Sequence, residues 1–272
     1  MNGEPHDFWG KLDRNGGRVS WHPLIDHCAD VAACFQALLR QPVIRKRFAR
    51  LGHIDDLSAT QRAHLGYLAA LHDLGKYNIG FQNKAYPNRR PTAGHVREPL
   101  ALFGSGDESA NRLSLAIRFD ELCSWGMEPE TFGELLVTAL AHHGKPEQLG
   151  LPARADIWQA AGGLNPFEGI ADLAENARHW FPEAFQRQNS DVLPKEPPFQ
   201  HAFSGLLTLA DWLGSDTNFF PFSNDGETDR FVSSQRRGIR VPRVSTWRRS
   251  TRMRRGTRSF KRGRSEEVSN SS

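Results

Sequence analysis

The chain has 272 residues, enough for one large domain or two small ones, and 38% of them are hydrophobic, so it can bury a substantial core. No stretch approaches the ~20 consecutive apolar residues of a membrane span, and residues 1–7 lack the basic and apolar regions of a signal peptide. Its 3 cysteines are an odd number without a close metal-binding pair, which argues against a disulfide framework and favours a reducing, cytoplasmic setting.

Positive charge is distributed unevenly along the sequence. The net charge is +4, but 13 Lys or Arg residues and no Asp or Glu lie in residues 236–264. The rest of the chain has 22 basic against 31 acidic side chains, a net charge of about −9. A cationic surface over the whole fold is therefore excluded, so a polyanion must be held by bound cations, a local patch, the tail or a partner.

The first predicted helix follows a short opening segment. Residues 8–11 (FWGK) lead into a turn-like stretch, residues 13–17 (DRNGG), and Pro23 then suits the first turn of a helix. The apolar stripe of this helix recurs at helical spacing: Leu24, Cys28, Val31, Phe35 and Leu38. His27 lies on its inner side, where a lone histidine is more often structural than a ligand. No stretch shows the alternation typical of a strand.

A second helix is predicted from about Ser58 to the pair His72-Asp73. Leucines at helical spacing give it a buried face, and Gly75 is expected to end it by adopting the left-handed conformation. Neighbouring helical positions point about 100° apart, so the two side chains can reach a common ion only where the helix ends. Taken alone, the pair has a structural alternative, a core histidine with a capping carboxylate.

The third predicted helix repeats this design. It starts near Glu130 and ends in the adjacent pair His142-His143, followed by Gly144 and Pro146. Two desolvated imidazoles at a helix end each need a partner, which favours a functional interpretation. Between the two helices, a loop over residues 78–92 leads to His95, just ahead of a helix that has Pro99 in its first turn.

The remainder is predicted to contain short helices, one strong helix and a tail. Residues 151–195 read as short helices and loops, and residues 198–215 as a long apolar helix that carries Asp211. A buried carboxylate there must be paired, protonated or bound to a metal. We expect residues 1–225 to form the folded domain. Residues 226–272 are too rich in Arg, Ser and Gly to bury a core and are expected to be a disordered basic tail.

The side chains that suit metal binding all lie at the end of a predicted helix, beside one or on its inner face: His27, His72, Asp73, His95, His142, His143 and Asp211. Five histidines and two carboxylates fit two divalent ions that share one bridging ligand. The other histidines lack such placement and are predicted to be structural: His6, His22, His53, His64, His179 and His201.

These motifs resemble the HD superfamily of metal-dependent phosphohydrolases, and most closely the HD nuclease domain of the nuclease-helicase of type I CRISPR interference. The resemblance covers roughly the first 225 residues, from residues 8–11 through the ligands to residues 210–216 (ADWLGSD) and 219–221 (FFP). It implies an all-α fold, the HD-domain helical bundle. It also implies one ion held by His27, His72, Asp73 and Asp211, and a second held by Asp73, His95, His142 and His143. Asp73 would be the bridge.

The resemblance implies a hydrolase, an endo- or exonuclease that cuts phosphodiester bonds of single-stranded DNA in antiviral defence. Two ions about 3.5–4 Å apart activate a water and stabilise the attacking and leaving oxygens. Asp73 and Lys76 are the predicted catalytic residues, and Lys76 and Ser215 the predicted substrate contacts. The histidine-rich ligand set favours Mn, Co, Ni or Fe over Mg.

Two features depart from the family pattern. The sequence after His95, Val96-Arg97-Glu98-Pro99, is not the expected small-residue surrounding. The sequence also lacks the Gly-x-x-x-x-Gly-Lys-Ser/Thr loop of a helicase. The resemblance implies a separate helicase and an RNA-guided surveillance complex as partners. Two other functions stay open: an HD phosphohydrolase acting on nucleotides or cyclic nucleotides, and a non-catalytic nucleic-acid-binding protein that uses its Arg-rich tail.

Overall fold

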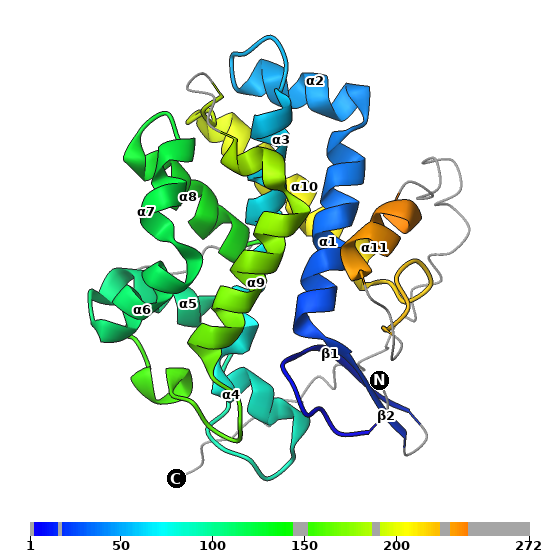
Figure 1. The fold of residues 1–272 in the computed structure, drawn as a ribbon, viewed down its shortest axis with the longest axis vertical. Helices are drawn as coiled ribbons and strands as arrows, with labels where there is room; N and C mark the ends of the chain where they lie inside the picture. The colour runs from blue at the N-terminus through cyan, green and yellow to red at the C-terminus, as the bar shows by residue number, and fades with distance from the viewer. Residues whose placement is uncertain (1–2, 16–17, 144–151, 187–190, 224–228, 239–272) are drawn as a thin grey trace, which may run out of the picture. The chain divides into compact units, whose positions relative to one another are not determined.

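The computed structural model describes residues 3–15, 18–143, 152–186, 191–223 and 229–238. Within these ranges the chain is mostly helical, with one two-stranded sheet (Figure 1). The strands and longer helices are β1 (Trp9–Asn15), β2 (Arg18–Pro23), α1 (Leu24–Leu39), α2 (Pro42–Leu51), α3 (Ala59–Ala70), α5 (Arg97–Ser105), α6 (Glu108–Ile117), α8 (Pro129–Leu140), α9 (Pro166–Trp180), α10 (Pro197–Ser215) and α11 (Arg230–Gly238). The short helical turns are η1 (Leu74–Tyr77), α4 (Ile79–Gln82), η2 (Asn83–Ala85), α7 (Phe119–Leu122), η3 (Cys123–Trp125), η4 (Ala155–Trp158) and η5 (Pro182–Phe185). None of the described helices has the length and apolar character needed to cross a membrane.

Helix α1 is the centre of the core, and α3, α10 and α11 pack against it (Figure 1). It is buried on almost every side, because its small residues alternate with large apolar ones that fill the space between the neighbouring helices. The fully buried side chains of α1 include Leu24, Cys28, Ala29, Val31, Ala32 and Phe35. The predicted apolar stripe is thus part of a helix that has no extended solvent-facing side.

The expected all-α fold is accompanied by one short sheet, which residues 9–23 form. β1 and β2 pair antiparallel, with Leu12 opposite Trp21 and a register shift between Trp9 and Lys11. Only the first residues of β1 are buried, and its last three are exposed, so apolar and polar residues do not alternate over its length. A strand that is half outside the core gives no period-two signal, which is why the pattern did not predict it.

Helix α3 begins and ends in different ways, and only its start matches the prediction. Ser58 accepts a hydrogen bond from the Gln61 backbone N–H, and the Gln61 side chain accepts one from the Ser58 N–H, so a capping box fixes the start. At the other end, Gly75 is not left-handed but lies within η1. Glycine is required here because the backbone of His95 passes close to Gly75. A Cβ on Gly75 would lie 1.8 Å from the backbone oxygen of His95.

The segment that follows α10 does not separate from the fold at residue 225. α11 packs on α1, and the compact unit of the chain extends from Met1 to Arg240. Arg230 donates from Nε and Nη2 to both oxygens of the buried Asp30, at 2.7 and 2.8 Å. The predicted boundary at residue 225 therefore falls too early. The predictions about residues 239–272, and the place of Gly144 at the end of its helix, lie outside the described residues.

Candidate metal centre

His72 and Asp73 lie in the turn between the last residue of α3 and η1, as expected for side chains delivered by a helix end. The Nδ1 of His72 is 2.9 Å from the backbone oxygen of Ala69. Because a carbonyl only accepts, Nδ1 carries the proton, and the lone pair of Nε2 faces away from the helix. That Nε2 is buried and has no hydrogen-bond partner among the described residues.

His142 repeats this geometry at the end of α8. Its Nδ1 is 3.0 Å from the backbone oxygen of Ala139, and its buried Nε2 likewise has no hydrogen-bond partner within the described ranges. Thr208 on α10 donates to the backbone oxygen of His142 at 2.5 Å, which ties the turn to the neighbouring helix. The adjacent His143 is exposed, and its Nε2 lies 2.9 Å from Nε2 of His95. Two facing nitrogens at this distance can share one proton or one cation.

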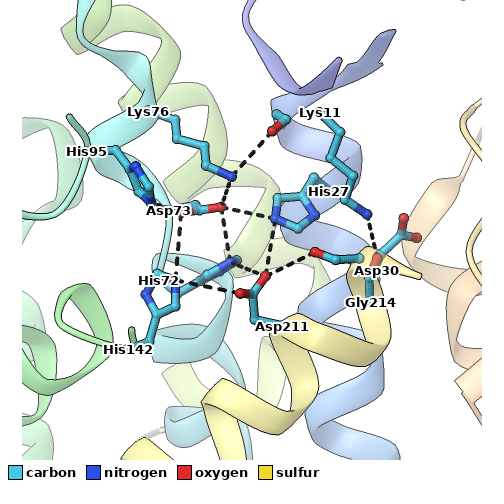
Figure 2. Close-up of polar contacts among 12 residues, drawn as sticks. Lys11, His27, Asp30, His72, Asp73, Lys76, His95, His142, Asp211 and Gly214 are labelled. Atoms are coloured by element: carbon cyan, nitrogen blue, oxygen red, sulfur yellow. Dashed lines mark hydrogen bonds and ion pairs between the residues drawn. The ribbon is translucent and has the colours of Figure 1, made fainter. Parts of the chain in front are cut away.

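One carboxylate oxygen of Asp73 meets three nitrogens. Oδ2 lies 3.0 Å from Nε2 of His27, 3.3 Å from Nε2 of His72 and 2.6 Å from Nζ of Lys76 (Figure 2). His27 differs from the other histidines, because its Nδ1 lacks a hydrogen-bond partner in the described part of the chain. Asp73 is 1% exposed, so its negative charge depends on these neighbours rather than on water.

The second oxygen of Asp73 faces the other side of the centre. Oδ1 lies 3.5 Å from Nε2 of His95 and 3.9 Å from Nε2 of His142. Asp211, from α10, lies beside the same histidines. Its Oδ1 is 3.6 Å from Nε2 of His27, and its Oδ2 is 3.8 Å from Nε2 of His142. The two oxygens of Asp73 thus point to two different sets of histidines.

The donor atoms form two groups, each compact enough for one ion. The atoms of each group lie within 4.8 Å of one another. The first group is His27, His72, Asp73 and Asp211, and the second is His95, His142 and His143. The unpartnered Nε2 atoms of His72 and His142 and the unpartnered Oδ1 of Asp73 converge on these groups, and burying them costs free energy unless a cation is bound. The residues therefore fit a divalent cation on chemical grounds.

The protonation states follow from burial and from the two carboxylates. Burial lowers the pKa of His72, but the charges of Asp73 and Asp211 outweigh it and raise that pKa to about 9. Burial opposes ionisation of Asp73, yet the Lys76 ammonium and His72 hold its pKa well below the usual range. Without a cation His72 thus carries a second proton, on Nε2, which occupies the lone pair that a metal would otherwise use.

The other buried histidines are neutral in the pH range of most assays. Burial, together with the charges of Lys11 and Lys76, lowers the pKa of His27 to about 3. Burial likewise lowers the pKa of His142 to about 3 and that of His95 to about 4. Neutral imidazole is the form that binds a metal, so these side chains are prepared for ligation.

Metal affinity is expected to fall as the pH falls below the raised pKa of His72, about 9. A ligand must be deprotonated, so an incoming ion displaces the His72 proton, and the apparent affinity should change by about tenfold per pH unit. The already neutral His27, His95 and His142 add nothing to this slope. Competition titrations with Ni²⁺ or Mn²⁺ between about pH 6 and 8 measure it. Affinity that is independent of pH would contradict the assignment of His72.

The two predicted substrate contacts lie beside the carboxylates. Lys76 Nζ contacts Asp73 and donates to the backbone oxygen of Gly10 at 3.3 Å, and Ser215 Oγ donates to Oδ1 of Asp211 at 3.3 Å. Both side chains therefore touch ligand residues, and contact with substrate stays a prediction. The six histidines assigned structural roles belong to neither ligand group among the described residues.

Sequence reasoning missed the support given by Lys11. A register shift in β1 places Gly10 against His27, where a Cβ would lie 2.9 Å from the His27 Cβ. The next residue, Lys11, donates to the backbone oxygen of Gly214 at 2.6 Å and so fastens the last turn of α10, which carries Asp211 (Figure 2). The conspicuous FWGK stretch was the only signal, and its role depends on a bulge that the sequence does not reveal.

Comparison with known proteins gives consistent matches. A family model described as "Cas3, HD domain" matches residues 9–220. The CRISPR-associated endonuclease/helicase Cas3 of Thermus thermophilus is 28% identical over 231 residues, which cover 75% of this chain and 22% of that protein. The protein of the same name from Escherichia coli K12 is 26% identical over 253 residues, covering 82% of this chain and 27% of the relative. The chain thus spans about a quarter of the length of the curated relatives it matches.

Solved structures show the same fold. The Thermus thermophilus cas3 HD domain, crystallised in the presence of Ni2+, superimposes with a TM-score of 0.50 at 23% identity, covering 80% of this chain and 83% of that one. A chain of a CRISPR RNA-guided surveillance complex in a pre-nicking state gives a TM-score of 0.54 at 22% identity, covering 88% of this chain and 28% of that one. The expected helical HD-domain fold is confirmed.

Proposed function

Since the chain belongs to the Cas3 HD-domain family, we propose that it is a metal-dependent nuclease that hydrolyses phosphodiester bonds of single-stranded DNA in type I CRISPR interference. The observation that carries the proposal is the position of Asp73. Its two oxygens face two separate groups of imidazoles, and the buried atoms there lack other partners in the described part of the chain. A pair of cations bridged by this carboxylate would lower the pKa of a water and neutralise charge on a phosphodiester.

The residues of the chain have defined tasks in this proposal. His27, His72 and Asp211 would hold one ion, and His95, His142 and His143 the other, with Asp73 between them. Lys76 lies 2.6 Å from the shared carboxylate and favours its ionised form, and its ammonium would neutralise charge on a phosphate bound beside Asp73. The imidazole-rich donor set favours Mn, Co, Ni or Fe over Mg, which prefers oxygen ligands.

The partners follow from the relatives and belong to the same proposal. The relatives are named nuclease/helicases, and one similar chain belongs to an RNA-guided surveillance complex. This chain matches about a quarter of their length and its sequence contains no phosphate-binding loop. We propose that a helicase of the kind named in these relatives supplies the unwound strand.

The purified chain with added Mn²⁺, Ni²⁺ or Co²⁺ is expected to cut single-stranded DNA and to leave intact duplex largely uncut. The expectation rests on the burial of the candidate ligands: Asp73, His72 and His142 are each 1% exposed, and a single strand can bend toward buried groups more easily than a stiff duplex. Gel assays with matched oligonucleotides measure this, with nucleotides and cyclic nucleotides as competing substrates. Preferred hydrolysis of nucleotides would favour a phosphohydrolase. Binding without any metal-dependent cleavage would favour a binding protein that uses its tail.

A further inference from the structure

The segment between the metal centre and α5 concentrates positive charge on an otherwise acidic chain. Residues 74–97 contain five Lys or Arg residues and no Asp or Glu, whereas the chain outside residues 236–264 carries a net charge of about −9. The segment forms η1, α4, η2 and the loop that returns to His95. Its charge is therefore placed at the border of the metal centre and not at a remote surface.

Lys84 is an exposed cation beside the centre that the proposed function does not use. Its Nζ lies 4.6 Å from the centroid of the Phe81 ring, and that ring lies 5.3 Å from the ring of His95. Lys76 approaches the same Phe81 ring at 5.7 Å, so the two ammonium groups lie close to one aromatic side chain. Lys84 forms no ion pair with any residue that the structure describes, so its charge is available to a ligand. The pKa of Lys84 is lowered by partial burial and by Lys76, against the charge of Glu98.

Two further arginines continue the positive charge along the same segment. Arg89 stacks on the ring of Tyr86 at 3.8 Å, and Arg90 donates hydrogen bonds to the backbone oxygens of Pro87 and Arg89. Both guanidinium groups are exposed, and neither pairs with a carboxylate in the described ranges. Stacking on an aromatic ring fixes the Arg89 side chain, so less conformational entropy is lost when it binds a ligand.

A cleft of about 470 Å³ lies beside the two arginines. Trp9, Tyr86, Arg89 and Arg90 are among its lining residues, and Trp9 stacks on Phe81 at 4.7 Å. Two carboxylates also line the cleft. Asp156 is paired with Arg154 at 2.8 Å, whereas Asp7 accepts a hydrogen bond from the backbone of Phe8 and has no cationic partner in the described ranges.

We infer that Lys84, Arg89 and Arg90 form a phosphate-binding strip that holds the backbone of a single strand as it enters or leaves the metal centre. The strip consists of exposed cations without carboxylate partners in the described part of the chain, two of them held over aromatic rings, and it starts next to His95. Phosphates complement this charge without sequence preference, and a strand has one at every nucleotide. The inference rests on the proposed function and names the side chains that hold its substrate.

The test compares two triple variants of the full chain that lose the same charge. One is Lys84→Gln, Arg89→Gln and Arg90→Gln. The control is Lys46→Gln, Arg47→Gln and Arg50→Gln on α2, where all three side chains are exposed. Binding of a labelled oligothymidylate without added metal is measured by fluorescence anisotropy over a range of salt concentrations.

The strip variant should bind more weakly, and the slope of log affinity against log salt should become shallower by about 2, since each phosphate contact on a single strand contributes about 0.7. The loss of strand affinity in the strip variant, relative to the unmodified chain, should therefore shrink by about tenfold between 50 and 200 mM salt. The control should keep the slope of the unmodified chain. Equal slopes for the two variants would overturn the inference. The inference would also be overturned if the strip variant bound the strand normally and lost activity only in the presence of a protein partner. The strip would then be a protein contact.

A separate measurement keeps the two proposals distinguishable. Metal-dependent hydrolysis of bis(4-nitrophenyl) phosphate and of single-stranded DNA by the unmodified chain tests the proposed function. If the unmodified chain binds and cuts the strand but the salt slope does not respond to the strip variant, only the strip is wrong. If the unmodified chain shows neither strand binding nor diester hydrolysis with any of the metals, the proposed function fails and the strip fails with it.

Discussion

Replacement of Asp73 by alanine is expected to abolish DNA cleavage and to lower the metal content of the protein. Asp73 is the residue whose carboxylate faces both ligand groups, through Oδ2 on one side and Oδ1 on the other. Without it, two cations would repel each other with no shared negative charge between them, and the nearby Lys76 would add to the repulsion. Loss of a residue that hydrogen-bonds a metal ligand lowers metal affinity or activity by about 10–100-fold, so loss of a bridging ligand should lower activity by more than about 100-fold.

The measurement pairs cleavage rates with metal per chain, determined by elemental analysis. Asp73→Asn keeps the shape of the side chain and removes its charge, so it should resemble the alanine variant in activity. Asp172→Ala, at an exposed position of α9, is the matched control and should keep both metal and cleavage. Thermal unfolding shows whether each variant is folded. Near-normal cleavage by Asp73→Ala with metal still in place would rule out a bridging role.

The local part of the centre could be predicted from the sequence. Both His72-Asp73 and His142-His143 follow an apolar helical run, and a helix end is where adjacent side chains can turn toward one point. The structure places both pairs in turns directly after α3 and α8. Even the tautomers follow from this local geometry, because each first histidine bonds a carbonyl three residues earlier.

The long-range part could not be predicted, because it depends on close approaches between segments far apart in sequence. Gly75 is needed because the backbone of His95 passes where a Cβ would be, and not because the helix ends in a left-handed residue. Gly10 and Lys11 act in the same way, since a register shift in β1 sets their positions beside His27 and Gly214. Sequence periodicity carries information about one element at a time and none about such contacts.

Helix α11 was missed because its own sequence gives little reason to fold. Residues 230–238 (RFVSSQRRG) include only two large apolar side chains, Phe231 and Val232, and Val232 is 41% exposed. A nine-residue helix is marginal in isolation, so this one depends on packing against α1 and on Arg230. The composition of residues 226–272 therefore suggested disorder throughout, although tertiary contacts stabilise a helix at the start of this range.

Replacement of Arg230 by alanine is expected to destabilise the protein by about 3–5 kcal/mol, the usual cost of removing one partner of a buried ion pair. Asp30 is fully buried, and its carboxylate accepts hydrogen bonds from Arg230, His22 and Ser234. The loss of Arg230 therefore leaves much of the Asp30 charge uncompensated. Burial opposes ionisation of Asp30, but hydrogen bonds from His22 and Arg230 lower its pKa below the usual value. The contribution should therefore be present near neutral pH and be lost as the pH falls through the lowered pKa.

Chemical denaturation of the full chain, the two point variants and two truncated chains measures this effect and locates the end of the fold. Arg236→Ala, exposed on the same helix, should change the unfolding free energy by less than about 0.5 kcal/mol. A chain that ends at residue 240 should be as stable as the full chain, whereas a chain that ends at residue 225 should lose at least as much stability as Arg230→Ala, because it lacks all of α11. If the chain ending at residue 225 were instead as stable as the one ending at residue 240, the contact between α11 and α1 would contribute nothing, and the boundary expected from composition would be correct after all.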